Sequence, residues 1–406
     1  MGVATAATQI EGGEVEHSWM DWSRQGKISD GSSPARADDH YRLWKEDAAL
    51  MQDMGIRHYR LGLEWARIEP RENEFDQEAI DHYRAEITLL REYGITPLLT
   101  LHHFTNPMWF ENSGAFLNKK NIPLFLAFVE RMVTEFGDLV NEYITINEPN
   151  VYSVFSYMQG TWPPGRRSLW STVRVMHNLA AAHIAAYALI HRLRDGGTGE
   201  SVRVGFAHHL RVWAPKNPNS IKDKFFVLIN RYFFQGYLTN ALLKHKYCDF
   251  IGLNYYSRSA VSGIGDGTAV GVPVNDLGWE IYPPGIVECA EELYAACPLP
   301  IYVTENGACD NQDTFRSRYI MEHLQTIAAS SLPFERYYHW SFCDNFEWAE
   351  GESARFGLVH VDYETQKRTI KESGQFYTDI IKNNGVTEAA YQQYAVGQNY
   401  RRNHGN

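Results

Sequence analysis

Short runs of consecutive apolar residues alternate along this chain with longer stretches whose apolar positions recur every three or four residues. The short runs predict strands buried on both faces, where successive side chains must be apolar. The longer stretches predict amphipathic helices that each bury one face. The predicted strands are residues 2–9, 57–65, 96–104, 143–148, 202–209, 249–256, 300–306 and 337–345.

Helical periodicity follows the strands in turn. The predicted helices are residues 38–55, 76–93, 121–136, 172–193, 223–245, 285–296, 314–329 and 369–383. In the first of them, Asp38 is the predicted N-cap and Gly55 the predicted stop, because a short carboxylate caps free amides and glycine accepts a left-handed turn.

Strands that alternate with helices indicate a parallel sheet, and eight such units predict an α/β fold of the (β/α)₈ TIM barrel type. We expect a single catalytic domain over residues 1–406, with a C-terminal tail from about residue 385. A doubly wound open sheet is the alternative, but it normally carries a glycine-rich phosphate turn after an early strand, and this sequence has none. The glycine-rich stretch 263–273 does not open a helix after a strand, so it is interpreted as a flexible loop.

Amino-acid composition and net charge limit the kinds of partner that we expect for this protein. The 406 residues are 44% apolar and 21% charged, which is typical of a folded soluble protein. A net charge of −11 disfavours a nucleic-acid partner, and no uninterrupted apolar run is long enough to predict a membrane span. The start of the chain lacks the pattern of a signal peptide, and the five cysteines form no CxxC pair, so we expect a reduced, cytoplasmic protein. The oligomeric state is not predicted.

Polar side chains gather where the predicted strands end, which is where barrel enzymes build their active sites. Two of them are glutamates: Glu148 after the fourth strand and Glu305 in the seventh. One strand-terminal glutamate is more often a loop residue than a catalyst. Two facing carboxyls, however, are what glycosidic bond cleavage requires, one protonated to deliver a proton and one ionised to attack or to activate water. Repulsion between the two negative charges keeps one of them protonated.

Metal and cofactor chemistry is not indicated. The pairs His102-His103 and His208-His209 could suggest metal ligands, but adjacent strand residues point to opposite faces, so each pair offers one ligand to a site. Hydrolysis without a metal or cofactor, on a small-molecule sugar substrate with many hydroxyls, fits these residues best.

Seven ordered motifs across residues 2–370 resemble glycoside hydrolase family 1, the β-glucosidase and β-galactosidase family. They are "GVATAATQIEG", "YRLGLEWARIEP", "TLHHFTNPMWF", "TINEPN", "FIGLNYYS", "VTENG" and "WSFCDNFEWAEGESARFGLVHVDYET". The resemblance implies a retaining exo-β-glycosidase that acts on terminal non-reducing β-D-glucosides and also accepts β-galactosides or β-fucosides, with a small-molecule β-glycoside or oligosaccharide as substrate.

The same resemblance implies roles for single positions. Glu148 would be the general acid/base and Glu305 the nucleophile, with Arg60 and Tyr256 orienting Glu305. Asn147 would hold the sugar 2-hydroxyl. The other implied sugar-binding residues are Gln9, His103, Trp340, Glu347, Trp348 and Phe356.

Two alternatives remain open. One is a 6-phospho-β-glycosidase, which the carboxylate of Glu347 disfavours because it would repel a phosphate. The other is a non-catalytic sugar-binding barrel. The chain also departs from the family pattern at Phe104, where tryptophan is usual, and at Glu352, where tyrosine is usual. The segment 210–248 looks short, and we expect this shortening to open the leaving-group side of the cleft.

Overall fold

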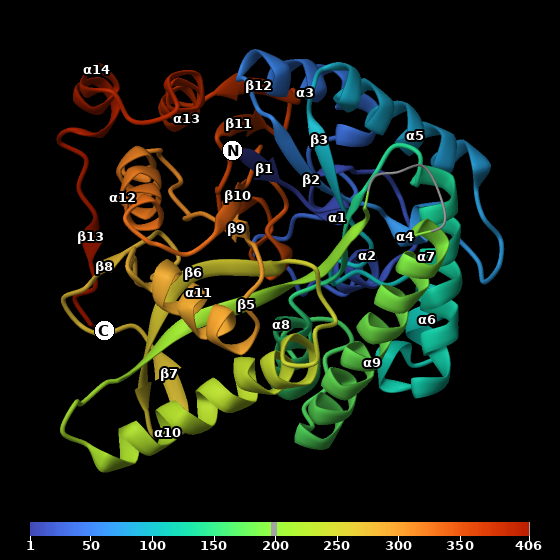
Figure 1. Ribbon diagram of the computed structural model, residues 1–406, viewed down its shortest axis with the longest axis horizontal. Helices are drawn as coiled ribbons and strands as arrows, with labels where there is room; N and C mark the ends of the chain where they lie inside the picture. The colour runs from blue at the N-terminus through green and yellow to red at the C-terminus, as the bar shows by residue number, and fades with distance from the viewer. Residues whose placement is uncertain (196–200, 406) are drawn as a thin grey trace.

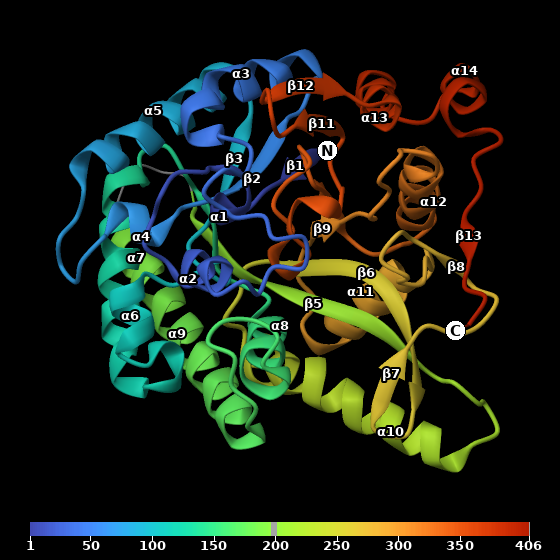
Figure 2. The same cartoon turned by 180° about the vertical axis from the view of Figure 1, so that it is seen from behind.

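The protein, described here by a computed structural model over residues 1–195 and 201–405, is a closed barrel of eight parallel strands (Figures 1 and 2). The barrel strands are β1 (Gly2–Ala4), β2 (His58–Gly62), β3 (Thr96–Thr100), β4 (Glu142–Asn147), β5 (Arg203–Pro215), β6 (Ile251–Ser262), β9 (Ile301–Asn306) and β10 (Phe334–Trp340). Each strand pairs with its neighbours in the barrel, and the pairing of β5 with β6 closes the ring. The predicted (β/α)₈ fold is therefore confirmed.

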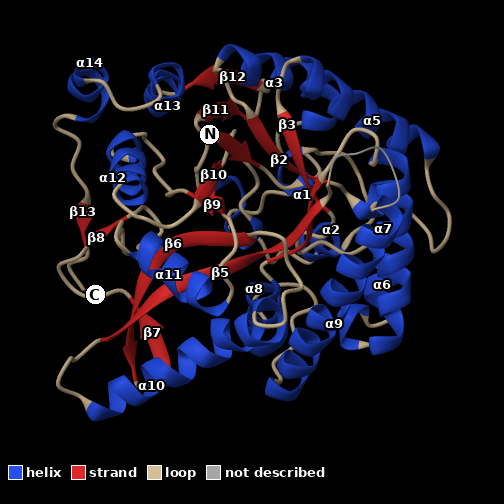
Figure 3. Cartoon of the chain, in the orientation of Figure 1, coloured by secondary structure: helices blue, strands red, loops and turns tan. Residues whose placement is uncertain are grey.

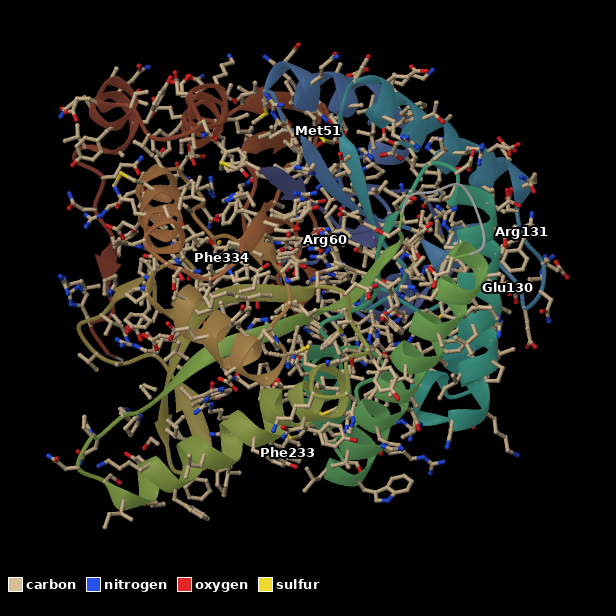
Figure 4. All side chains as sticks on the ribbon, in the orientation of Figure 1. Met51, Arg60, Glu130, Arg131, Phe233 and Phe334 are labelled. Atoms are coloured by element: carbon tan, nitrogen blue, oxygen red, sulfur yellow. The ribbon has the colours of Figure 1, made fainter. Side chains whose placement is uncertain are left out.

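Helices cover the outside of the strands (Figure 3). The principal helices are α3 (His40–Asp53), α5 (Gln77–Glu92), α7 (Ile122–Phe136), α9 (Leu169–Arg194), α10 (Ile221–Arg231), α11 (Gly285–Ala296), α12 (Arg316–Ala328) and α13 (Glu372–Asn383). In α7 the apolar side chains Phe125, Phe128 and Val129 are fully buried, at the three- and four-residue spacing that turns one helical face inward. Glu130 and Arg131 of the same helix lie at the outer surface (Figure 4).

Shorter elements complete the chain. They are α1 (Ala7–Ile10), α2 (Ser18–Arg24), α4 (Trp65–Ile68), α6 (Met108–Asn112), α8 (Pro149–Ser153), α14 (Glu388–Ala390), β7 (Gly265–Gly267), β8 (Pro273–Val274), β11 (Val359–Asp362), β12 (Lys367–Ile370), β13 (Arg401–Arg402), the 3₁₀ helices η1 (Ala115–Leu117), η2 (Lys119–Asn121) and η6 (Trp348–Ser353), and the π-helices η3 (Val154–Gln159), η4 (Tyr232–Gly236), η5 (Thr239–Leu243) and η7 (Tyr391–Ala395). Beyond residue 385 the chain packs back on the barrel, and β13 pairs with β8.

Five local predictions were wrong. The N-cap of α3 is Asp39, in a left-handed conformation, because Asp38 is buried and its backbone donates to Ile10 instead. The first strand ends at Ala4, because helix α1 begins at Ala7, and the third strand ends at Thr100.

The other two differences lie beside β6. The helix predicted for 223–245 ends at Arg231 and continues as the π-helices η4 and η5. The stretch 263–273, predicted as a flexible loop, contains β7, which pairs antiparallel with the end of β6. Strands β5 and β6 both run past the barrel rim, and this extension gives β7 an edge to join.

One helix of the described residues, α9, is long and apolar enough to cross a membrane by length and composition alone. Over half of its most apolar 18-residue window is buried inside the protein, and it packs on α7, β4 and β5. That packing is what a barrel helix needs to cover the strands.

Candidate active site

Most of the predicted site residues line one pocket at the C-terminal ends of the strands, with a volume of about 160 Å³. Those that line it are His103, Glu148, Tyr256, Glu305, Trp340, Glu347, Trp348 and Phe356. The other three, Gln9, Arg60 and Asn147, lie behind this lining and hydrogen-bond to it. The structure thus brings all eleven predicted residues into one connected site.

Arg60 is the buried centre of the site, near the middle of the barrel (Figure 4). It comes from β2, and its fully buried guanidinium donates to groups on three other strands. Nη1 reaches Oε1 of Glu305 at 2.5 Å, Nη2 reaches Oδ1 of Asn147 at 2.6 Å, and Nε reaches the Thr100 hydroxyl at 3.1 Å. Because a guanidinium is rigid and always charged, it fixes these acceptors in position.

Glu305, near the end of β9, has a donor on each carboxylate oxygen. Arg60 donates to Oε1, and the Tyr256 hydroxyl donates to Oε2 at 2.5 Å. Burial raises the pKa of Glu305, with help from the neighbouring Glu148 carboxylate, to about 7, although Arg60 and Tyr256 favour the ionised form. The two donors leave the carboxylate one orientation.

Glu148 follows β4 directly and is the N-cap of α8, with φ at +41° and ψ at +59°. This left-handed conformation is uncommon for a residue with a side chain and marks stored strain. Both of its hydrogen-bond donors, Nδ2 of Asn254 at 2.8 Å and Nδ1 of His209 at 2.9 Å, reach the same oxygen, Oε1. Within residues 1–195 and 201–405, no donor reaches Oε2, so a proton can sit there.

The amide of Asn254 has a defined orientation. Its Oδ1 accepts from the Thr304 hydroxyl at 2.6 Å, which leaves Nδ2 to donate to Glu148. Burial opposes the ionised form of Glu148, but His209 and Asn254 together hold the pKa of Glu148 below its ordinary value. His209 therefore influences the protonation of Glu148.

Asn147 and His103 are linked side by side. Nδ2 of Asn147 donates to Nε2 of His103 at 2.9 Å, and this contact leaves the His103 proton on Nδ1. Burial and the nearby Arg60 charge hold the pKa of His103 well below its ordinary value, so the ring is neutral. Nδ1 is buried without a protein partner, as a group that binds a ligand hydroxyl would be.

Gln9 and Glu347 form the other polar wall. Gln9 comes from α1, and its Nε2 donates to Oε2 of Glu347 at 3.1 Å and to Oδ1 of Asn345 at 3.1 Å. Burial raises the pKa of Glu347 to about 8, with a contribution from the Glu305 charge. Oε1 of Gln9 is buried without a protein partner, so it can accept from a hydroxyl.

Aromatic rings form the floor and one side of the pocket. Trp340 ends β10, and its ring centroid lies 5.9 Å from that of His103. Trp348 packs on Phe104 at 5.2 Å, and both have positive φ, +49° and +66°. Phe356 contacts Tyr256 edge-on at 6.4 Å. Flat apolar faces next to hydrogen-bonding groups suit a sugar ring, which has both kinds of surface.

The pocket also includes residues that the sequence did not single out as sugar-binding. Its outer part is lined by Val151, Phe155, Leu277, Trp279 and Arg211. They stand on α8, η3, β5 and the loop after β8, where neither strand ends nor motifs mark them. His209 and Asn254 do end predicted strands, so position alone could have pointed to them.

The geometry supports carboxyl chemistry. Among the described residues, no group of three or more His, Cys, Asp or Glu side chains is arranged to hold a metal ion. One carboxylate with both oxygens fixed and another with a free oxygen, in a buried pocket lined by aromatic rings and amides, can attack a sugar carbon and protonate its leaving group.

Comparison with known proteins gives the same picture. The model of "Glycosyl hydrolase family 1" matches residues 1–252 and 239–386. The chain is 33% identical to β-glucosidase A of Thermotoga maritima, covering 95% of this chain and 97% of that protein. It is 30% identical to a β-glucosidase of Agrobacterium sp., covering 95% and 96%.

Solved structures agree with these relatives. The β-glycosidase of Pyrococcus horikoshii superposes with a TM-score of 0.88 at 31% identity, covering 98% of this chain and 97% of that one. The β-glucosidase of Thermotoga maritima in complex with glucoimidazole gives 0.87 at 30%, covering 95% and 98%. With its barrel, its pocket and a family match along most of its length, this chain belongs to glycosyl hydrolase family 1 and is a glycosidase.

Proposed function

We propose that this glycosidase is an exo-acting, retaining enzyme that hydrolyses terminal non-reducing β-D-glucosides and accepts β-galactosides and β-fucosides. Glu305 is the nucleophile and Glu148 the acid/base. The observation that carries the assignment is the unequal surroundings of the two carboxyls: Glu305 has a donor on both oxygens, one from the permanent charge of Arg60, whereas Glu148 keeps Oε2 free.

The reaction proceeds in two displacements. Glu305 attacks the anomeric carbon and forms a glycosyl ester, while the proton on Oε2 of Glu148 moves to the departing oxygen. The ester carries no charge, so the pKa of Glu148 falls relative to that in the Michaelis complex, and its carboxylate removes a proton from the water that hydrolyses the ester. Two inversions retain the β-configuration.

The proton must be on Glu148 when substrate is bound. In the empty site His209 favours the ionised form of Glu148 through its charge and its hydrogen bond. The guanidinium of Arg60 and the hydroxyl of Tyr256 donate directly to Glu305 and favour its ionised form. Two negative charges this close repel each other, so with substrate bound the pair keeps one proton, which is on Oε2 of Glu148 while Arg60 and Tyr256 hold Glu305 ionised.

The polar wall sets the preferred sugar. Asn147 is positioned for the 2-hydroxyl, next to Arg60 and Glu305, and Gln9 with Glu347 forms a donor and acceptor pair for the hydroxyls at the far end of the ring. Glu347 lies beside the carboxamide of Gln9 rather than a cation, an arrangement that favours hydroxyls over a phosphate. The cytoplasmic location stays a prediction.

The test is hydrolysis of four p-nitrophenyl β-glycosides: the glucoside, galactoside, fucoside and 6-phosphoglucoside. We expect turnover of the neutral sugars only, with β-glucose as the first product by NMR. Turnover of the phosphorylated sugar alone would contradict the proposed role of Glu347, and the absence of turnover on all four would contradict the enzymatic assignment.

A further inference from the structure

Helix α10 exposes most of its large apolar side chains to solvent. Asp223 is buried on the inner face, where its carboxylate accepts from the backbone amides of Asn217 and Gly263 at 3.2 Å each. Five large apolar side chains on the opposite face are exposed to solvent. Their exposed fractions are 85% for Ile221, 57% for Phe225, 64% for Leu228, 42% for Ile229 and 58% for Tyr232, which follows the helix. Because Asp223 is hydrogen-bonded on the inner side, the fold itself keeps these five side chains turned outward.

The five exposed residues form one stripe. They stand at positions i, i+4, i+7, i+8 and i+11, so they share a single helical face. We call this stripe of Ile221, Phe225, Leu228, Ile229 and Tyr232 the α10 stripe. An 11-residue helix is about 16 Å long, and an exposed apolar strip of that length on a soluble protein marks a contact surface.

Positive charge flanks the stripe. Lys222 and Lys224 are exposed on its two sides, and within the described residues neither forms an ion pair. Residues 216–246 contain six Lys or Arg and one Asp, a net charge of +5 in a chain whose net charge is −11. Lysines at the borders of an apolar helical face are typical of helices that lie in the interface of an anionic membrane.

A second exposed apolar group continues the surface. Leu169, Trp170 and Val173, at the start of α9, are 60%, 65% and 44% exposed. His177, one turn further on, hydrogen-bonds the Tyr237 hydroxyl at 3.1 Å, which ties this end of α9 to the segment that follows α10. Helix α10 and the start of α9 lie at the lower edge of the molecule in Figures 1 and 2, and Phe233 is labelled at this edge in Figure 4.

We propose that the α10 stripe and the start of α9 dock the enzyme on an anionic lipid bilayer, with the apolar side chains at the acyl boundary and Lys222 and Lys224 at the headgroups. A bilayer offers an extended surface that is apolar below and negative above, which matches both features together. A symmetric dimer through this surface would instead bring the unpaired lysines that flank the stripe in the two copies toward each other.

Docking places the pocket near the lipid surface. Phe234, two residues after the end of the α10 stripe, packs on His209 with ring centroids 5.7 Å apart. Next to it, the Trp213 indole donates to Gln235 at 3.0 Å. The segment that contacts lipid therefore also supports the wall of the active site, and the outer pocket residues Leu277 and Trp279 are apolar.

Vesicle flotation tests the proposal. The probes are vesicles of phosphatidylcholine alone and vesicles with about 30% phosphatidylglycerol, in 50 mM and in 500 mM salt. We expect partition to the anionic vesicles at low salt to exceed that to the neutral ones by about ten-fold or more and to fall at high salt. No flotation with anionic vesicles above the lipid-free background would overturn the proposal.

Two double variants and their matched controls locate the surface. Phe225→Ser with Leu228→Ser shortens the stripe, and Lys222→Glu with Lys224→Glu reverses its flanking charge. Each should lower partition about ten-fold or more. The controls are Val270→Ser with Val396→Ser, which are exposed elsewhere, and Lys119→Glu with Lys120→Glu on η2; both should bind like the wild type.

Two further measurements distinguish lipid docking from misfolding of the variants and from dimer formation. Hydrolysis of soluble p-nitrophenyl β-glucoside should be unchanged in all four double variants, which shows that they are folded. Light scattering should give the same mass for the wild type and the Phe225→Ser, Leu228→Ser variant. A dimer that this variant dissociates, without vesicle binding, would overturn the proposal in favour of a second copy of the chain.

Discussion

The inner and outer halves of the pocket are built differently. The inner half rests on barrel strands: Arg60 is fully buried and joins β2, β3, β4 and β9 through one guanidinium. The outer half rests mainly on a loop and short helices, with Arg211 on the end of β5, and Trp279 is 38% exposed. Side chains held at strand ends are fixed by the barrel itself, whereas loop side chains can change without disturbing it. Cleavage of the glycosidic bond should therefore depend on the inner half of the pocket. The choice of leaving group should depend on the outer half.

The largest effect should come from Glu305→Ala. Loss of the nucleophile should lower kcat/KM at least about 10⁴-fold, because no ester can form. Azide or formate should restore part of the activity by entering the space left by the carboxylate, and the product should have the α-configuration by NMR. Glu46→Ala, an exposed glutamate on α3, is the control and should have wild-type activity. A rescued product of β-configuration would show that the two roles are reversed.

Glu148→Ala should have a smaller effect that depends on substrate. Release of a poor leaving group such as an alkoxide should slow about 10²–10⁴-fold, whereas 2,4-dinitrophenolate needs no proton and should leave at near the wild-type rate in the first step. Azide should then give a β-glycosyl azide. Equal losses for both leaving groups in single-turnover kinetics would mean that Glu148 is not the acid.

His209→Asn should change the pH dependence of kcat/KM more than its maximum value. A charged His209 lowers the pKa of Glu148, so its removal raises that pKa and keeps Glu148 protonated and Glu305 ionised to lower pH. The acid limb of kcat/KM should shift to lower pH, because Glu305 loses its proton more easily when Glu148 keeps one, and the alkaline limb should shift to higher pH with the pKa of Glu148. Tyr256 and Arg211, the other titratable or charged neighbours, are unchanged.

A matched control separates charge from packing. His245→Asn replaces an exposed histidine outside the pocket and should leave both limbs in place. If His209→Asn lowers kcat/KM by the same factor at every pH, His209 supports the pocket sterically and does not set the protonation of Glu148.

The contrast between the halves also explains what the sequence could predict. Glu148 and Glu305 stand in or directly after strands that apolar runs mark clearly, and the resemblance supplied Arg60 and Tyr256. Leu277 and Trp279 lie in a loop whose shape depends on one side chain, Asn275, whose Oδ1 accepts from both their backbone amides. No periodic pattern in the sequence predicts such a turn, so the position of this loop at the pocket is seen only in the folded structure.

The same limit applies at the barrel rim. Asp38 looks like an N-cap from its place before a helical pattern, but tertiary packing buries it, and Asp39 takes that position. The exposed apolar stripe of α10 also has the periodicity of an ordinary amphipathic helix. Periodicity gives the angle between two faces of a helix; which of them faces the barrel is decided by contacts distant in sequence, here Asp223 with Gly263.

The smallest effect should come from the outer half. Leu277→Ala removes part of an apolar wall beside the leaving group, so KM for octyl β-glucoside should rise about 3–10-fold, in line with the partial loss of apolar burial. KM for methyl β-glucoside, whose aglycone does not reach that wall, should stay within two-fold. Leu193→Ala, at an exposed leucine of α9, is the control. A parallel rise for both glucosides would mean that Leu277 shapes the sugar site, and the division between the two halves would fail at this loop.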